Sequence, residues 1–215
     1  EDFSSIQEAI DFASDGDEIV VYPGVYTRIG SGSIVDTMGK RIRIYSYAGP
    51  ETTIISGEGE YGIRGIRCVN GETQKTVIEG FTITGGNEIK GAGIYCDNNS
   101  NSSFIDCVIS SNGSSIYGGG VAFVSCSPTL INCIISGNST DTVGGGMYLL
   151  SSDPTITNCT FYNNFSSDAG GGVYIDVSSG PLFSNCSFVE NGANNQAGGV
   201  FISSSGSTLT ECLFD

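Results

Sequence analysis

The chain has 215 residues, and its 23 acidic and 8 basic residues give a formal net charge of −15 at pH 7. An acidic surface of this kind repels nucleic acid and anionic membranes, so we exclude both as partners. All basic residues lie within the first 90 positions, and residues 91–215 contain no lysine, arginine or histidine. No apolar run approaches the roughly 18 residues that a transmembrane helix needs. The start at Glu1, directly before a helix signal, is what we expect of a processed secreted protein or of a chain that has been trimmed.

A short capping helix is expected within residues 1–16. Ser4 and Ser5 are good N-cap residues, and Gln7 and Glu8 each follow one of them by three positions, as in a capping box. Apolar residues then recur at the spacing of one helix face, at Ile6, Ala9, Ile10 and Ala13. Gly16 is a natural place for the helix to end.

Residues 17–90 are expected to form irregular first coils of a β-structure. Residues 18–22 read Glu-Ile-Val-Val-Tyr, a β-branched strand that Pro23 and Gly24 interrupt. Residues 41–45 alternate polar and apolar side chains with a period of two, as a half-buried strand does.

Residues 91–215 repeat with a period of 26 or 27 residues, marked by five cysteines: Cys107, Cys133, Cys159, Cys186 and Cys212. The position three residues before each of these cysteines is always Phe, Leu or Ile, and the position two residues after is always Ile or Phe. Such apolar columns indicate strands that stack in register, each coil adding roughly 4.8 Å. The sequence therefore predicts one all-β domain, residues 1–215, that is a right-handed parallel β-helix with three strands and about 26 residues per coil.

Two sets of motifs resemble known families. The segments Ser5-Ile-Gln-Glu-Ala-Ile-Asp-Phe-Ala and Gly16-Asp-Glu-Ile-Val-Val-Tyr-Pro-Gly-Val-Tyr resemble the N-terminal cap and first strand of pectin-lyase-like β-helix proteins. The Gly-Gly-Gly-apolar phrase, with Phe161-x-x-Asn164 and Phe188-x-x-Asn191, is similar to the repeats of chlamydial polymorphic membrane proteins. The resemblances cover nearly the whole chain and imply the β-helix fold. They imply no single activity, because such repeats occur in enzymes, adhesins and structural proteins.

The cysteine column is interpreted as core packing. Metal binding would need C-x-x-C pairs or histidines, and the sequence has neither. A reactive thiolate needs a nearby cation or base, which this part of the chain lacks. Stacked side chains point the same way, which disfavours disulfides within the column, so any disulfide is expected among Cys68, Cys96 and Cys126. We expect no metal and no cofactor.

A second column consists of asparagines five residues after the cysteines: Asn112, Asn138, Asn164 and Asn191. The first three lie in Asn-x-Ser/Thr sequons, so glycosylation is one interpretation. The other is a ladder in which each amide bonds its neighbours along the stack. Asn191 continues the column without a sequon, which favours the ladder. Further sequons, candidates for glycosylation, stand at Asn98, Asn101, Asn158 and Asn185.

Carboxylates are the residues on which an enzymatic activity would depend. A glycosidase needs two carboxyl groups, about 5 Å apart for retention or about 6.5–9.5 Å for inversion. Asp97 and Asp176 share a column but lie three coils apart, roughly 14 Å at the strand spacing. Asp141 and Asp168 lie on successive coils and are the candidate catalytic pair, with solvated turn acids as the other interpretation.

An aromatic column is expected on the outside of the coil, at Tyr95, Tyr148, Tyr174 and Phe201. Ala122 is its one gap. Such a strip can stack sugars or bind a partner, or a loop can cover it.

The sequence stops three residues after Cys212, inside the predicted last strand, so we expect the C-terminal end to be uncapped. Unpaired strand edges invite another chain, which favours self-association or continuation of the solenoid through this end.

These observations favour a non-catalytic extracellular β-helix that serves as a structural or adhesive cell-surface module, assembling head-to-tail into a filament. Glycans and other surface proteins are further candidate partners. The alternative is a pectin-lyase-like enzyme that acts on a neutral glycan through Asp141 and Asp168.

Overall fold

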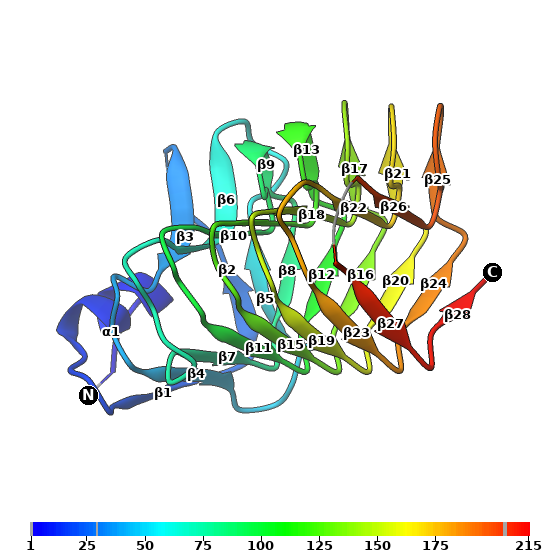
Figure 1. Ribbon diagram of the computed structural model, residues 1–215. Coiled ribbons are helices and arrows are strands. Elements are labelled where there is room, and N and C mark those ends of the chain that lie inside the picture. Colours follow the sequence, from blue (N-terminus) through cyan, green and yellow to red (C-terminus); the bar gives the residue numbers. More distant parts are fainter. Residues whose placement is uncertain (1, 29, 204–205) are drawn as a thin grey trace.

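The computed structural model describes residues 2–28, 30–203 and 206–215 as one elongated solenoid (Figure 1). Within those residues one helix, α1 (Ile6–Phe12), precedes 28 short strands. The strands stack from coil to coil, and the two termini lie at opposite ends of the rod. The predicted all-β solenoid with a short N-terminal helix is confirmed.

Two sheets of eight strands each form two sides of the solenoid. In stacking order, sheet A contains β1 (Glu18–Val21), β4 (Arg43–Ser46), β7 (Val77–Glu79), β11 (Ser103–Ile105), β15 (Thr129–Ile131), β19 (Thr155–Thr157), β23 (Leu182–Ser184) and β27 (Thr208–Thr210). Sheet B contains β2 (Gly24–Tyr26), β5 (Thr53–Ser56), β8 (Thr82–Thr84), β12 (Val108–Ser110), β16 (Ile134–Ser136), β20 (Thr160–Tyr162), β24 (Ser187–Val189) and β28 (Leu213–Phe214).

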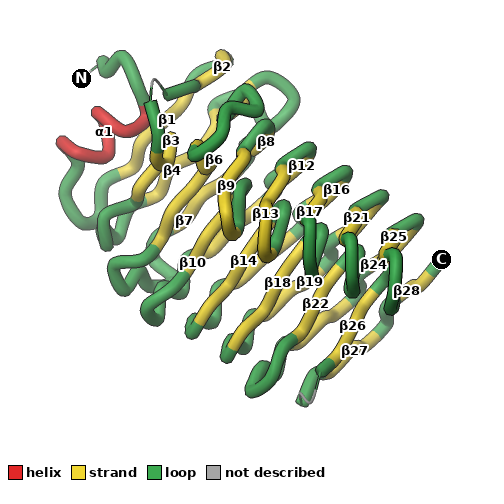
Figure 2. The backbone as a smooth tube through the Cα atoms, turned by 90° about the horizontal axis from the view of Figure 1, so that it is seen from above, coloured by secondary structure: helices red, strands yellow, loops and turns green. Residues whose placement is uncertain are grey.

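Sheet C has two parts, which meet where β6 pairs antiparallel with β9. The part that closes the coil contains β3 (Gly32–Asp36), β6 (Ile63–Cys68), β10 (Ile94–Cys96), β14 (Val121–Val124), β18 (Met147–Leu150), β22 (Val173–Ile175) and β26 (Val200–Ile202). The other part protrudes as a ridge that we call the fin: β9 (Asn87–Lys90), β13 (Gly113–Tyr117), β17 (Ser139–Thr140), β21 (Phe165–Ser166) and β25 (Gly192–Ala193). Figure 1 and Figure 2 both show the fin strands in a row along the rod. The sequence did not predict this ridge.

The strand register reproduces the apolar columns of the sequence. In sheet A, Leu130 pairs with Phe104 on one side and with Ile156 on the other, and all three side chains are buried. In sheet B, Phe161 pairs with Phe188, and the two rings stack with their centroids 5.0 Å apart. Burial of each such side chain contributes roughly 1.5–3 kcal/mol, so the columns are the main source of stability.

The helix α1 covers the first coil and is capped at both ends. The Ser5 hydroxyl accepts a hydrogen bond from the N–H of Glu8 at 3.1 Å, as the N-cap signal predicts. At the other end, the Lys40 ammonium donates to three backbone carbonyls of the last turn and the residues after it, at 2.6–2.9 Å. A cation there complements the negative end of the helix dipole, so a residue about 30 positions away completes the cap.

A buried carboxylate holds the irregular coils together. Glu72 accepts hydrogen bonds from the Thr37 hydroxyl at 2.7 Å, from the N–H groups of Gly39 and Asn70 at 2.9 Å, and from the Ser100 hydroxyl. Burial opposes ionisation, but these hydrogen bonds, led by those of Ser100 and Thr37, outweigh it and lower the pKa of Glu72. The Glu72 carboxylate therefore stays ionised at the point where three successive coils meet.

Candidate functional surfaces

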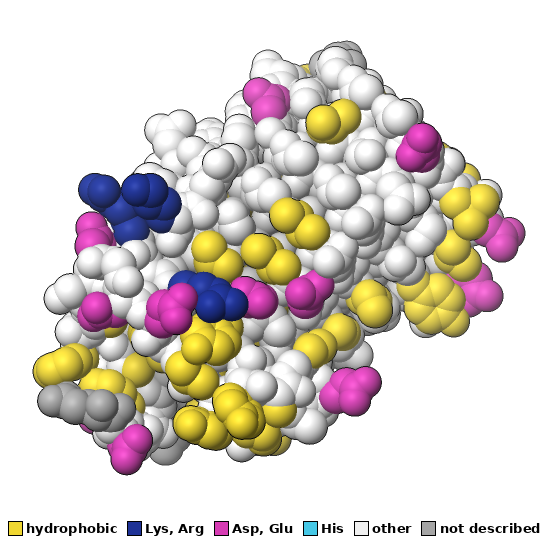
Figure 3. All heavy atoms as spheres, turned by 90° about the horizontal axis from the view of Figure 1, so that it is seen from below, with side chains coloured by type: hydrophobic (Ala, Val, Ile, Leu, Met, Phe, Trp, Pro, Cys, Tyr) yellow, Lys and Arg dark blue, Asp and Glu magenta, His cyan; other side chains and the backbone are white. Residues whose placement is uncertain are grey.

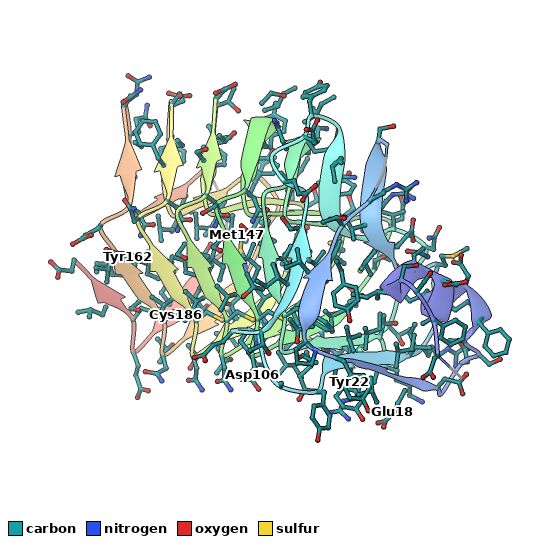
Figure 4. The ribbon with its side chains drawn as sticks, turned by 180° about the vertical axis from the view of Figure 1, so that it is seen from behind. Glu18, Tyr22, Asp106, Met147, Tyr162 and Cys186 are labelled. Carbon is teal, nitrogen blue, oxygen red and sulfur yellow. The ribbon has the colours of Figure 1, made fainter. Side chains whose placement is uncertain are left out.

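The cysteine column lies inside the coil. Cys186, labelled in Figure 4, is buried, as are Cys107, Cys133 and Cys159, whereas Cys212 on the last coil is partly exposed; all eight cysteines of the chain are free thiols. Cys68 and Cys96 are paired in register without a disulfide. Burial raises the pKa of Cys126 to about 12, and it also raises that of Cys96. Within the described residues, no three His, Cys, Asp or Glu side chains gather into a possible metal site.

The asparagine column forms a continuous hydrogen-bonded ladder inside the turn that follows sheet B. The amide of Asn112 donates to the carbonyl oxygen of Asn138 at 3.0 Å, Asn138 to Asn164 at 3.0 Å, and Asn164 to Asn191 at 2.9 Å. Each oxygen also accepts the backbone N–H of the preceding asparagine, as in the 3.0 Å bond from Asn112. Because Asn112, Asn138 and Asn164 are almost fully buried, these amides satisfy backbone groups that water cannot reach.

A second asparagine ladder, which the sequence did not predict, lies on the exposed turn between sheets A and B. Asn132 donates to Asp106 at 2.9 Å, Asn158 to Asn132 at 3.1 Å, and Asn185 to Asn158 at 2.8 Å. All four residues have φ between 51° and 55°, a conformation that asparagine and aspartate tolerate better than most residues. The amide nitrogens of Asn158 and Asn185, two of the candidate glycosylation sites, are thus engaged within this ladder.

The other two candidate glycosylation sites lie in the turn after sheet C. Asn98 is exposed, and its amide donates to the carbonyl of Val69 at 3.2 Å. Asn101 is half-buried, and its oxygen accepts the N–H of Ser127 at 2.6 Å. Glycosylation of either asparagine stays a prediction.

The aromatic strip is covered, so of the two interpretations that the sequence left open the structure supports the one in which other segments cover it. Tyr148 is 4% exposed, and Tyr95, Tyr174 and Phe201 are half-buried against the same cluster. Val143 and Ala169, on the returning arm of the fin, pack over these rings. The physical reason is that each coil leaves sheet B, runs out along the fin and folds back over the outer face of sheet C.

Tyr117 of the fin fills the gap that Ala122 leaves in the aromatic column. Its ring stacks on Tyr148 at 4.6 Å, Tyr148 on Tyr174 at 5.8 Å, and Tyr174 on Phe201 at 4.9 Å. Stacked aromatic pairs contribute about 0.5–1.5 kcal/mol beyond their burial. The strip is therefore a second core, which attaches the fin to the solenoid.

Two of these tyrosines are anchored by acids of the same sheet. The Tyr95 hydroxyl donates to Asp97, and the Tyr148 hydroxyl donates to Asp176, each at 2.8 Å. Burial and the neighbouring carboxylate raise the pKa of both phenols. Asp97 and Asp176 thus serve as hydrogen-bond acceptors for the second core.

The repeated glycine phrase allows the two arms of the fin to touch at their base. A Cβ atom on Gly145 would lie 2.3 Å from the carbonyl oxygen of Phe165, and one on Gly119 would lie 2.1 Å from that of Ser139. Only glycine permits so close an approach of two backbones. The phrase was a signal for the fin that could have been read from the sequence.

A shallow recess lies on the outside, between the turns that end sheet B and the base of the fin. It has a volume of about 370 Å³ and is lined by Asn87, Ser111, Gly137 and Ser139, among other small residues. On the next coil, Phe165 pairs with Ser139 and is 43% exposed. We call this recess the fin groove; Phe165 is not among the residues that line it.

A family model described as the right-handed beta helix region matches residues 51–214. The chain belongs to this family. The match confirms the predicted fold and handedness and is consistent with the pectin-lyase-like resemblance, whereas the resemblance to chlamydial repeats stays a prediction. Searches among curated proteins and among solved structures returned no significant match. In the part of the chain that the structure describes, no helix is long and apolar enough to span a membrane.

The two candidate catalytic acids of this β-helix do not occupy equivalent positions. Val143 pairs with Ala169, a step of 26 residues, so Asp168 lies opposite Thr142 and its N–H bonds the Thr142 carbonyl at 2.9 Å. Asp141 is therefore one residue out of register with Asp168, and both side chains are exposed. Asp168 accepts a hydrogen bond from Asn195 at 2.9 Å. The two acids thus lie on successive coils but not directly opposite each other.

The charges of the β-helix are divided along its length. Figure 3 shows the lysine and arginine side chains of one face gathered over its N-terminal half, whereas acids lie at both ends. Because the basic residues all precede residue 91, the regular coils present an uncharged or negative surface. A surface of this kind disfavours anionic ligands along the C-terminal part of the rod.

Proposed function

We propose that this β-helix is a non-catalytic extracellular module with a structural or adhesive role. The observation that carries the proposal is that stacked polar side chains of neighbouring coils form hydrogen bonds with one another. The asparagines form ladders, and Asp97, Asp176 and Glu72 accept hydrogen bonds that hold neighbouring elements. Polar groups arranged in this way stiffen a rod, and the rod then presents its outer faces at a fixed spacing.

Self-association is part of the proposal. Within the described residues, β26, β27 and β28 are the last strands of their sheets, and Leu213 and Phe214 of β28 are 61% and 53% exposed. A further parallel coil can pair there through the strand edges, and a second copy of the chain that adds head-to-tail continues the rod. Electron microscopy of the purified protein would show filaments, and strictly monomeric sedimentation at high concentration would remove this part of the proposal.

The competing enzymatic role is tested by assaying the protein for release of reducing ends from neutral glycans. We expect none. If cleavage is found and the double variant Asp141→Ala, Asp168→Ala abolishes it, the chain is an enzyme and the non-catalytic proposal fails. The double variant should keep the circular dichroism spectrum of the wild type, because both acids are exposed.

A further inference from the structure

A cavity of about 550 Å³ lies at the N-terminal end of the rod, between the helix α1 and the strand β1. Most of its wall is apolar and includes Phe3, Ile6 and Phe12 on the side of the helix and Ile19 on the side of the strand. Phe12 is 66% exposed, and its ring centroid lies 5.4 Å from that of Phe3. Figure 3 shows hydrophobic side chains gathered at this end of the molecule. The volume is typical of a ligand site.

The cavity lies where the inner core of sheet A is left incomplete. Ile19 pairs with Ile44, and Ile44 pairs with Ile78, so the three form one inward-facing column. Ile44 and Ile78 are each 1% exposed, whereas Ile19 is only half-buried and lines the cavity. An apolar side chain that entered the cavity would extend this column by one position, and its removal from water would favour binding.

The backbone beside the cavity is a free strand edge. Glu18, labelled in Figure 4, begins β1 at the helix-covered end of the rod, and no strand of the described residues pairs with the other edge of β1. The carbonyls of Asp17 and Val21 accept N–H groups of the next coil at 3.1 and 2.8 Å. Because alternate residues of a strand bond opposite sides, the N–H and C=O groups of Glu18 and Val20 point away from that coil. An extended peptide can add to such an edge as a further strand.

The charged groups around the cavity are acidic. Its lining contains the carboxylates of Asp2, Asp17 and Glu18 and no lysine or arginine. Of these three acids, Glu18 alone forms an ion pair within the described residues, an exposed one with Arg43 at 3.2 Å. Residues 1–27 contain no basic residue. An apolar cavity with acids at its rim and a free strand edge fits a peptide that has an apolar centre and basic flanks.

The last coil of a second copy would reach the same edge in the head-to-tail rod proposed above. That coil brings no positive charge, since residues 91–215 contain no lysine, arginine or histidine. A basic peptide is therefore the better match for the acidic rim, and it should compete with growth of the rod.

We infer that this cavity and the free edge of β1 form a docking site for an extended, basic peptide segment of a partner protein. The segment adds to sheet A as a strand, with an apolar side chain next to Ile19 and basic side chains next to Asp2 and Glu18. The inference goes beyond the structural role proposed above and does not depend on assembly of the rod.

Fluorescence anisotropy with the labelled synthetic peptide Lys-Lys-Thr-Leu-Thr-Lys-Lys tests the site, and Glu-Glu-Thr-Leu-Thr-Glu-Glu is the charge-reversed comparison. We expect the basic peptide to bind at low salt, about tenfold more weakly at high salt, and the acidic peptide to show no binding. Replacement of the central leucine by glycine should weaken binding about tenfold, because nothing then fills the cavity.

Proline variants test the strand edge. Val20→Pro removes an N–H group that points away from the next coil, so the bonds between β1 and β4 are kept, and peptide binding should weaken about tenfold. The matched control is Val25→Pro on β2, the first strand of sheet B, outside the cavity lining. The neighbouring N–H of Gly24 bonds the next coil at 2.9 Å, so that of Val25 also points away, and this variant should bind normally.

Charge variants test the rim. The double variant Asp2→Asn, Glu18→Gln should weaken binding about fivefold and remove most of its salt dependence. Glu51→Gln with Glu60→Gln changes the net charge equally at two exposed acids outside the lining and should have little effect. Each variant is compared with the wild type by circular dichroism, and the rim variant still tests the site if Val20→Pro is misfolded.

Three results would overturn the inference: no binding of the basic peptide, equal binding of the basic and acidic peptides, or equal losses in Val20→Pro and Val25→Pro. Rods that the basic peptide neither binds nor shortens would show that a second copy occupies the edge, which also overturns it. Peptide binding without rods in electron microscopy would support the docking site and remove only the self-association, so the two failures are distinguishable.

Discussion

The irregular coils of residues 17–90 and the regular coils of residues 91–215 share one architecture but are stabilised differently. Every ion pair of the described residues lies within the first 90 positions, from Asp15–Arg41 at 3.4 Å to Arg64–Glu88 at 2.7 Å. The second region has no cation and relies on columns of identical or similar side chains. The first region also has apolar columns, such as Ile44 with Ile78, but its ion pairs are not repeated from coil to coil.

The difference shows what repetition supplies. When coils repeat, each asparagine accepts a hydrogen bond from the asparagine of one neighbouring coil and donates one to that of the other. Uncharged side chains are then enough to satisfy the buried polar groups of the turns. Where coils differ in length, one-off partners such as Glu72 and Lys40 must close the turns and the cap. The regular coils should therefore be sensitive to loss of a ladder residue, and the irregular coils to pH and salt.

The largest effect is expected from Asn138→Leu in the inner ladder. It leaves the N–H and amide groups of Asn112 without their acceptor in a buried turn, which should lower the free energy of unfolding by about 3 kcal/mol. Urea denaturation followed by circular dichroism measures the loss. The matched control is Asn132→Gly in the exposed ladder, which removes the side chain at a φ of 55° that glycine adopts without strain and should cost under about 1 kcal/mol; similar losses for both would show that burial is not the cause.

The next effect is expected from Glu72→Gln in the irregular coils. Loss of the charged acceptor should cost about 2 kcal/mol near pH 7. Because the folded pKa of Glu72 is lowered, its stabilisation is complete above the ordinary glutamate pKa and disappears as the pH falls through the folded value. The difference in the free energy of unfolding between wild type and variant, measured by urea denaturation, should thus decrease below about pH 4. A gap that stays constant down to pH 2 would contradict the assignment.

A smaller effect is expected from Tyr117→Ala, which removes the ring that fills the gap at Ala122. The loss of one stack and its burial should cost about 1.5 kcal/mol. Hydrogen exchange should increase first in β13 and β17, since the second core attaches the fin to the coil. Uniform exchange changes across all three sheets would instead show that the fin and coil unfold as one unit.

The smallest effect is expected from Arg43→Gln, which removes two exposed ion pairs of the irregular coils, to Glu18 and Glu79. Such pairs contribute roughly 0.5 kcal/mol, and salt screens them. The difference from wild type in urea denaturation should therefore vanish at 1 M sodium chloride. Persistence of the difference at high salt would point to packing of the arginine on Tyr45, 4.2 Å from the ring centroid.

Much of the candidate surface could be predicted from residues alone, and some could not. The columns that begin at Cys107 and Asn112 could be predicted, because stacked coils repeat the same environment. The burial of Tyr148 under the fin could not be predicted, because it depends on the path of the fin. From the sequence, the glycine phrase was interpreted only as the start of a strand. The offset of one residue between Asp141 and Asp168 was not predicted, because only the pairing of Val143 with Ala169 fixes the register of these turns.

The sequence by itself determined the coil length, the inward-facing columns and the β-helix fold, because a period of two within strands and of about 26 between coils is set by backbone geometry. Only the tertiary structure decided which outer faces are open. The fin folds back over sheet C, where backbones touch at Gly145 and Tyr117 enters another coil's aromatic column. That return path depends on contacts between segments that are far apart in the sequence, and it covers the aromatic column of sheet C while Phe165 on the fin stays 43% exposed.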